Sequence, residues 1–181
     1  FEVFHYGVEG SDSGADTDVE LMTRDEWDIF RTLSYKKLHP DVPHDEVVRR
    51  LEDPTQYIGD LGNWDTPLYN EFNLRLKDRL KETYRSTETD IVCLPFGRAH
   101  DAALEGLNAV TVESGIGYPD SYRAYRIFES HTWMHSALAK ESKSPQNYWF
   151  IAPNYFDVGE WKLSLNPIPN AVGFFGRIND G

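Results

Sequence analysis

Residues 90–113 read DIVCLPFGRAHDAALEGLNAVTVE, and this stretch decides the fold class. Its near-continuous apolar run at 90–95 is typical of a strand buried in a parallel sheet. A short helical pattern follows over 99–105, and residues 109–113 form another apolar run with β-branched side chains. The order strand, helix, strand predicts a βαβ unit, the building block of an open parallel sheet.

The alternation of strands and helices continues on both sides of this stretch. Apolar side chains from Tyr69 to Tyr84 follow helical spacing, which predicts an amphipathic helix packed on a sheet. We therefore expect an α/β fold with a Rossmann-like open parallel sheet and helices on both faces. The other expected strands are residues 1–6, 19–22, 148–153 and 171–176, and the other expected helices are residues 23–33, capped by Thr23, 46–51, and 121–140, capped by Ser121.

Length and composition limit the protein class. A chain of 181 residues is long enough for one α/β domain with a sizeable core, and no apolar run is long enough to cross a bilayer. The single cysteine, Cys93, lies in an apolar run, which favours a buried thiol in a reducing, cytoplasmic compartment. The formal net charge of −12 disfavours binding to a phosphate backbone, so nucleic acid is not the partner expected for this part of the protein.

Residues 40–68 interrupt the regular pattern. They contain four prolines and many acidic side chains, with clear helical spacing only near 46–51. We interpret this segment as an irregular acidic insertion at the surface, which either recognises an acceptor or is a decoration of the fold.

Candidate site residues follow the ends of the expected strands. Ligands of open α/β sheets bind where the carboxyl ends of the strands meet. The glycines let a ligand approach the backbone, whereas a purely structural turn is the alternative explanation. The residues expected around a cleft are Gly97, His100, Glu113, Ser114, Gly115, Gly117, Tyr118 and Asn154.

The sequence does not indicate a bound cofactor or metal. Neither the dinucleotide fingerprint G-x-G-x-x-G nor a phosphate-binding P-loop occurs. His131 and His135 have the i, i+4 spacing of metal ligands on a helix, but Thr132 stands where a zinc protease has its glutamate. We expect these histidines to be packed, hydrogen-bonded helix residues.

The last part of the chain resembles the domain junction of a known enzyme family. Residues 151–157 read IAPNYFD, a spacer with NPIPN follows at 166–170, and residues 172–177 read VGFFGR. In order and spacing this resembles retaining glycosyltransferases of the GT-B fold (group 1, family 4-like), whose first domain ends in Pro-Asn-x-x-Asp and whose second opens with a strand ending in Gly-Arg. Residues 108–154 also look like glycosyltransferase-like proteins of large viruses and phages.

The resemblance implies a division of the chain and a reaction. Residues 1–166 would be the acceptor-side domain, and 167–181 the linker and first strand of a truncated donor-side domain. Arg177, with Gly176, would bind the diphosphate of a nucleotide-sugar donor, since a guanidinium neutralises the departing diphosphate. Glu113 stands where many enzymes of this family have a histidine that contacts the transferred sugar. The resemblance therefore implies a catalytic role for Glu113 from its position alone, since the residue type differs.

The implied function is transfer of a sugar from a nucleotide-diphosphate sugar to an acceptor glycan or another hydroxyl compound, without a metal or other cofactor. The truncated chain alone is expected to be inactive. One alternative is a glycosyltransferase acting on a hydroxylated DNA base. Another is a carbohydrate- or protein-binding domain that kept the fold without the chemistry.

Overall fold

The computed structural model describes residues 1–52, 64–85, 90–95, 97–142, 144 and 146–154. Its class is mixed α/β, with parallel sheets flanked by helices, which confirms the predicted Rossmann-like class. The strands are β1 (Phe4–Val8), β2 (Thr17–Met22), β3 (Ile91–Leu94), β4 (Val110–Ile116), β5 (Tyr125–Phe128) and β6 (Trp149–Ile151). The helices are α1 (Arg24–Leu38), α2 (His44–Glu52), α3 (Pro67–Thr83), the 3₁₀ turn η2 (Gly97–His100), α4 (Asp101–Leu104) and α5 (His131–Glu141).

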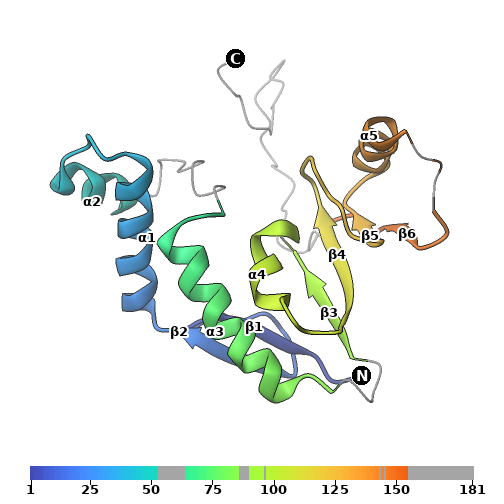
Figure 1. The fold of residues 1–181 in the computed structure, drawn as a ribbon, viewed down its shortest axis with the longest axis horizontal. Helices are drawn as coiled ribbons and strands as arrows, with labels where there is room; N and C mark the ends of the chain where they lie inside the picture. Colours follow the sequence, from blue (N-terminus) through green and yellow to red (C-terminus); the bar gives the residue numbers. More distant parts are fainter. Residues whose placement is uncertain (53–63, 86–89, 96, 143, 145, 155–181) are drawn as a thin grey trace, which may run out of the picture.

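The described strands form two sheets. β1 and β2 pair in parallel, and β3, β4, β5 and β6 form a four-stranded parallel sheet in chain order. Helix α3 contacts both α1 and α4, and in Figure 1 it lies between them, next to the two-stranded sheet. One hydrophobic cluster joins the sheets, because Leu21 of β2 and Leu94 of β3 are buried together with leucines of α3 and α4.

The four-stranded sheet is buried on one side. Leu94, Glu113, Arg126 and Trp149 stand in one cross-strand row, and all four are buried. Further along the same strands, Ile116 of β4 and Phe128 of β5 pack with Trp149 against α5. Since side chains alternate along a strand, the neighbouring positions point to the opposite side.

On that opposite side the side chains are exposed. Ile91, Val110, Tyr125 and Phe150 are 53%, 41%, 46% and 61% exposed, and Cys93 is exposed among them. The prediction of strands buried on both faces, with a buried Cys93, is therefore wrong. In the part of the chain that the structure describes, the helices packed on this sheet contribute to the clusters on the Leu94 side.

The expected helix over residues 121–140 is also wrong. Residues 125–128 form strand β5, and α5 begins at His131, where the Ser130 hydroxyl accepts a hydrogen bond from the Trp133 backbone N–H. β5 pairs with β4 on one side and β6 on the other, and Arg126 and Phe128 are buried in this sheet. Ser121, the expected cap, is buried in the connection between β4 and β5.

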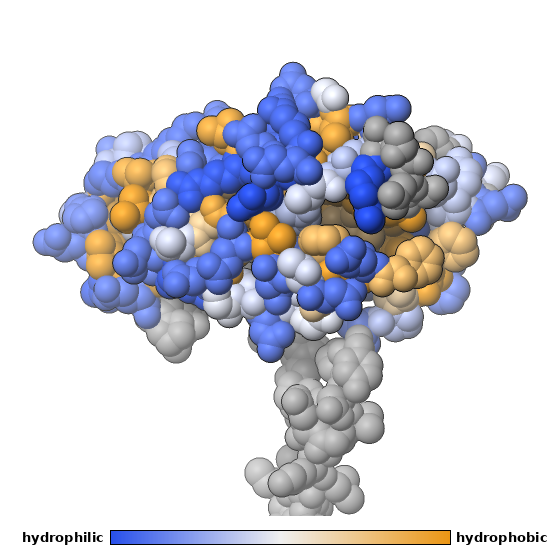
Figure 2. Space-filling model, turned by 90° about the horizontal axis from the view of Figure 1, so that it is seen from below, coloured by the Kyte–Doolittle hydropathy of each residue, from blue (hydrophilic) through white to orange (hydrophobic). Residues whose placement is uncertain are grey.

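The other expected elements agree with the structure apart from shifted ends. The first strand covers 4–8 rather than 1–6, and the helix expected over 46–51 is α2, inside the acidic segment 40–68. The strand expected over 171–176 lies outside the described residues. Among the helices that the structure describes, none has the length and apolar character needed to cross a membrane. The face in Figure 2 is largely hydrophilic, with separate exposed groups of hydrophobic residues.

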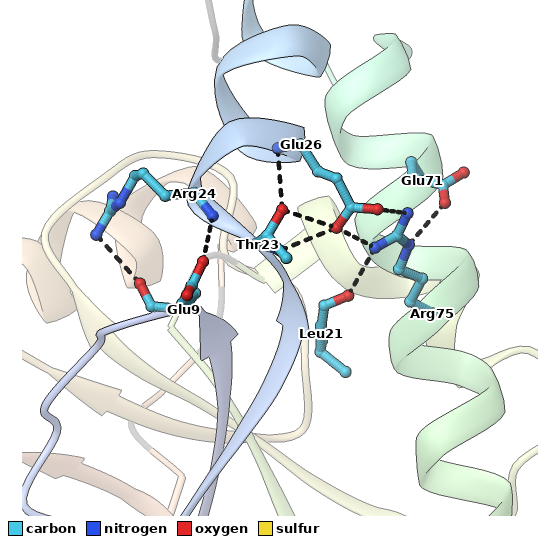
Figure 3. A network of polar contacts seen from close by, with 7 residues as sticks. All are labelled: Glu9, Leu21, Thr23, Arg24, Glu26, Glu71 and Arg75. Atoms are coloured by element: carbon cyan, nitrogen blue, oxygen red, sulfur yellow. Dashed lines mark hydrogen bonds and ion pairs between the residues drawn. The ribbon is translucent and has the colours of Figure 1, made fainter.

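A polar network fixes α1 against α3. Thr23 caps α1 as predicted: its hydroxyl accepts from the Glu26 N–H, and the Glu26 carboxylate accepts from the Thr23 N–H. The same carboxylate forms two hydrogen bonds of 2.8 and 2.9 Å with the Arg75 guanidinium of α3, as Figure 3 shows. Arg75 also donates to the Leu21 carbonyl and to Glu71, so one side chain joins β2, α1 and α3.

Candidate functional site

The connection between β4 and β5, residues 117–124, is held by Glu113. This carboxylate, at 0% exposed, accepts hydrogen bonds from the Tyr118 hydroxyl at 2.9 Å and from the backbone N–H groups of Tyr122 at 2.9 Å and Arg123 at 3.1 Å. A buried carboxylate is stable only when such donors replace its hydration. Glu113 therefore organises the connection, and in this structure its carboxylate is enclosed.

Gly97 closes the space above Glu113. A Cβ atom at Gly97 would lie 2.9 Å from Cδ of Glu113, closer than real Cβ contacts, and Gly97 has a φ of +46°, which side chains disfavour. Gly97 and Glu113, both expected around a cleft, lie next to each other in the structure. The group that approaches the glycine backbone is the protein's own carboxylate.

Tyr118 is held as a protonated hydrogen-bond donor. Burial raises the pKa of the Tyr118 phenol well above its usual range, and the charge of Glu113 and the hydrogen bond to it raise this pKa further. The phenol therefore stays neutral at physiological pH and continues to donate to Glu113.

Two arginines and an aspartate contact the Tyr122 side chain in the connection. The Tyr122 hydroxyl and the Arg123 guanidinium both bind the Asp101 carboxylate, the second at 2.7 Å. The guanidinium carbons of Arg98 and Arg123 lie 4.3 and 4.7 Å from the centre of the Tyr122 ring, within cation–π range. These contacts join η2 and α4 to the connection.

A cavity of about 420 Å³ lies between the connection and α5. This volume is within the usual range of small-molecule sites. Its wall combines aromatic rings with hydrogen-bonding and charged groups, which suits a ligand with an apolar ring face and polar substituents. Its lining includes Arg98, Tyr118, Tyr122, Arg126, Trp133 and Lys140.

Two of the cationic side chains in the cavity wall are paired with carboxylates. Arg126, at 2% exposed, forms an ion pair with Glu141 of α5 and stacks on Trp149, with its guanidinium carbon 4.5 Å from the ring centre. Lys140 forms an ion pair with Asp120. Arg126 also donates to the Arg123 carbonyl at 2.6 Å, so this buried charge fixes the end of the connection.

The predicted glycines and Ser114 lie around this connection. Ser114 and Gly115 sit where the register between β4 and β5 shifts, and Gly115 has a φ of +61° at this bulge. A Cβ atom at Gly117 would lie 2.6 Å from Cδ of Glu129, so a second glycine faces a carboxylate of the protein itself.

His100 and Asn154 lie apart from the cavity wall. The His100 ring is packed near Phe72 and Tyr69, and its Nδ1 lies 3.0 Å from Oδ1 of Asn73. Burial lowers the pKa of His100, so this imidazole is neutral near pH 7 and serves the packing of α3 against η2. Asn154 is exposed after β6.

Two further predicted groups have separate outcomes. His131 and His135 are exposed on α5 with their ring centres 6.1 Å apart, so the expectation that they are packed is wrong. Within the described ranges, no group of three or more metal-ligating side chains is arranged to hold a metal. The predicted donor-binding residues Gly176 and Arg177 lie outside the described residues.

Sequence reasoning missed most of the cavity wall. Arg98 lies in a strand-end segment, directly after Gly97, but nothing in its local pattern marks it. Tyr122 and Arg126 lie in a segment predicted to be helical, and Trp133 follows a helical pattern that is equally typical of core packing. These residues meet only because the connection folds back against α5.

Comparison with known proteins adds no family to this description. The chain matches no protein-family model, no curated protein and no solved structure. The class that the fold defines is therefore an α/β protein with parallel, Rossmann-like sheets, and function must be argued from the cavity.

Proposed function

We propose that this chain provides the acceptor-side domain of a nucleotide-sugar glycosyltransferase, with the cavity between residues 117–124 and α5 as its acceptor site. The cavity carries the proposal, because its wall pairs aromatic rings with hydrogen-bonding groups. Sugars have apolar C–H faces that pack on aromatic rings and hydroxyl groups that need polar partners. The resemblance of residues 151–177 to a domain junction supports the choice of reaction.

In the proposed reaction an acceptor hydroxyl forms a bond to the anomeric carbon of the donor sugar. The bond from that carbon to the nucleoside diphosphate breaks, and the hydroxyl proton leaves with the diphosphate or to water. The cavity side chains would orient the acceptor, which lowers the entropic barrier of the transfer. Gly176 and Arg177 remain the residues proposed to bind the donor diphosphate.

Within this proposal we assign Glu113 a positioning role. Its carboxylate is enclosed by three donors of the connection, so it shapes the wall that carries Tyr118 and Tyr122. This enclosure also favours a second candidate, a carbohydrate-binding domain without chemistry. The two candidates predict the same sugar binding and differ in the release of nucleoside diphosphate.

Blocking the cavity tests the proposal. Ser136 lines the cavity on α5, whereas Thr132, one turn earlier on the same helix, is exposed and is not part of the wall. Ser136→Trp should weaken the binding of methyl hexosides, followed by NMR shifts of the Trp133 indole, by roughly tenfold or more, because a new ring fills the cavity. Thr132→Trp should leave that binding unchanged.

Turnover then separates the two candidates, and it is measured in a protein in which a donor-side domain follows residues 1–181, because this chain alone is expected to be inactive. Release of UDP or GDP from nucleotide sugars, dependent on an added sugar acceptor and lowered by Arg177→Ala, would support the transferase. Sugar binding without such release would favour the non-catalytic domain. If no hexoside shifts the Trp133 signal, the cavity is not an acceptor site and the proposal is wrong.

A further inference from the structure

The cationic side chains of the cavity wall differ in whether they pair with a carboxylate. Arg126 pairs with Glu141, and Lys140 pairs with Asp120. Arg98 lies in the same wall, and within the described part of the chain its only polar contact is the stacking of its guanidinium on the Tyr122 ring. Among the described residues, one cationic group of the wall, Arg98, therefore has no carboxylate partner.

The nearest part of the chain does hold a carboxylate, but it is engaged elsewhere. Asp101, three residues after Arg98, accepts from the Arg123 guanidinium at 2.7 Å and from the Tyr122 hydroxyl. Arg98 is exposed, so its charge faces solvent at the cavity rather than a carboxylate of the described residues.

Stacking leaves the binding edge of Arg98 available. A guanidinium that rests on a ring uses its flat face, while its N–H groups point outward in the plane. This planar fork matches the oxygens of a phosphate or a carboxylate, to which arginine donates two parallel hydrogen bonds. The Tyr122 ring, whose centre lies 4.3 Å from the guanidinium carbon, thus holds this cation at the cavity wall.

We infer that the acceptor is an anionic sugar, bearing a phosphate or a carboxylate, whose charged group binds Arg98 while its ring lies along the aromatic wall of the cavity. This inference rests on the proposed function and names its substrate class. The ring contributes contacts with Tyr118 and Trp133, and the anion contributes the charged hydrogen bonds.

Three probes of similar size separate charge from ring recognition: glucose, glucose 6-phosphate and glucuronate. Titration calorimetry with the 181-residue chain should show the two charged sugars binding roughly tenfold or more tightly than glucose. Arg98→Gln should reduce the affinities of the charged sugars to about that of glucose, and should affect them far more than it affects glucose. Arg79→Gln removes the same charge from the exposed face of α3 and should change none of the three affinities.

The possible results have different meanings. Glucose binding as tightly as the charged sugars, with no effect of Arg98→Gln, would overturn the inference and leave the proposed acceptor site intact. Inorganic phosphate binding as tightly as glucose 6-phosphate would keep an anion site at Arg98 and contradict recognition of a sugar acceptor. No binding of any probe, or equal losses in the Arg98 and Arg79 variants, would overturn the inference.

Discussion

The backbone of Gly97 lies so close to Glu113 that a Cβ atom at Gly97 would be 2.9 Å from Cδ of the Glu113 side chain. Gly97 opens η2 shortly after β3, Glu113 lies within the neighbouring strand β4, and their contact covers a carboxylate that is 0% exposed. Through three hydrogen bonds, this carboxylate positions the connection that forms one wall of the cavity.

Gly97→Ala should lower the free energy of unfolding by about 3 kcal/mol, since the left-handed backbone disfavours a side chain and the Cβ atom displaces a buried carboxylate. Gly106→Ala is the matched control, because Gly106 has a φ of +81° with no atom within 4 Å of the added carbon. Its cost should be only about 1 kcal/mol. Equal losses for the two variants in urea unfolding would show that the contact with Glu113 is unimportant.

Glu113→Gln should destabilise the protein by about 2 to 3 kcal/mol, because its amide loses the charge that the three donors of the connection stabilise. Tyr118→Phe removes only one donor and should cost about 1 kcal/mol. Chemical unfolding of the two variants gives both values. A Glu113→Gln variant as stable as the wild type would contradict the positioning role of this carboxylate.

The contact between Glu26 and Arg75 should make stability sensitive to acid. The Arg75 hydrogen bonds, then that of the Thr23 N–H, lower the pKa of Glu26 from 4.5 to about 2. A carboxyl group whose pKa is lower in the folded state stabilises the protein at pH values above its pKa in the unfolded state. This stabilisation is lost as the pH falls toward the pKa of the folded state. Glu26→Gln should therefore be less stable than wild type at pH 7, with the difference shrinking between pH 4.5 and 2. A constant difference in urea midpoints over this range would refute the assignment.

Cys93 should react in the folded protein. It is exposed on the open side of the four-stranded sheet, while partial burial by its neighbours raises the pKa of its thiol. Because the thiolate is the reactive form, modification by a disulfide reagent should go to completion without denaturant, but more slowly at pH 7 than for free cysteine. The Cys93→Ser variant is the negative control, because it has no thiol to react. Reaction only after unfolding would show that this side of the sheet is covered.

Local patterns in the sequence determined the parallel α/β class, the capping of α1 by Thr23 and most helices and strands, because apolar period and capping chemistry act over a few residues. They failed at residues 121–130, where pairing with two neighbouring strands overrides a helical interpretation. Glu113 and Gly97 were predicted as site residues by their positions at strand ends. Their direct contact was not visible in the sequence.

Only the tertiary structure decided which faces are buried and which side chains form the cavity. Arg98, Tyr122 and Trp133 come from three elements, and they meet because the connection after β4 folds back over Glu113 toward α5. The sequence by itself determined the order of strands and helices, since that depends on neighbours along the chain. That Arg98 has no carboxylate partner among the described residues depends on where the nearby carboxylates pair, and that is settled only when distant segments pack together.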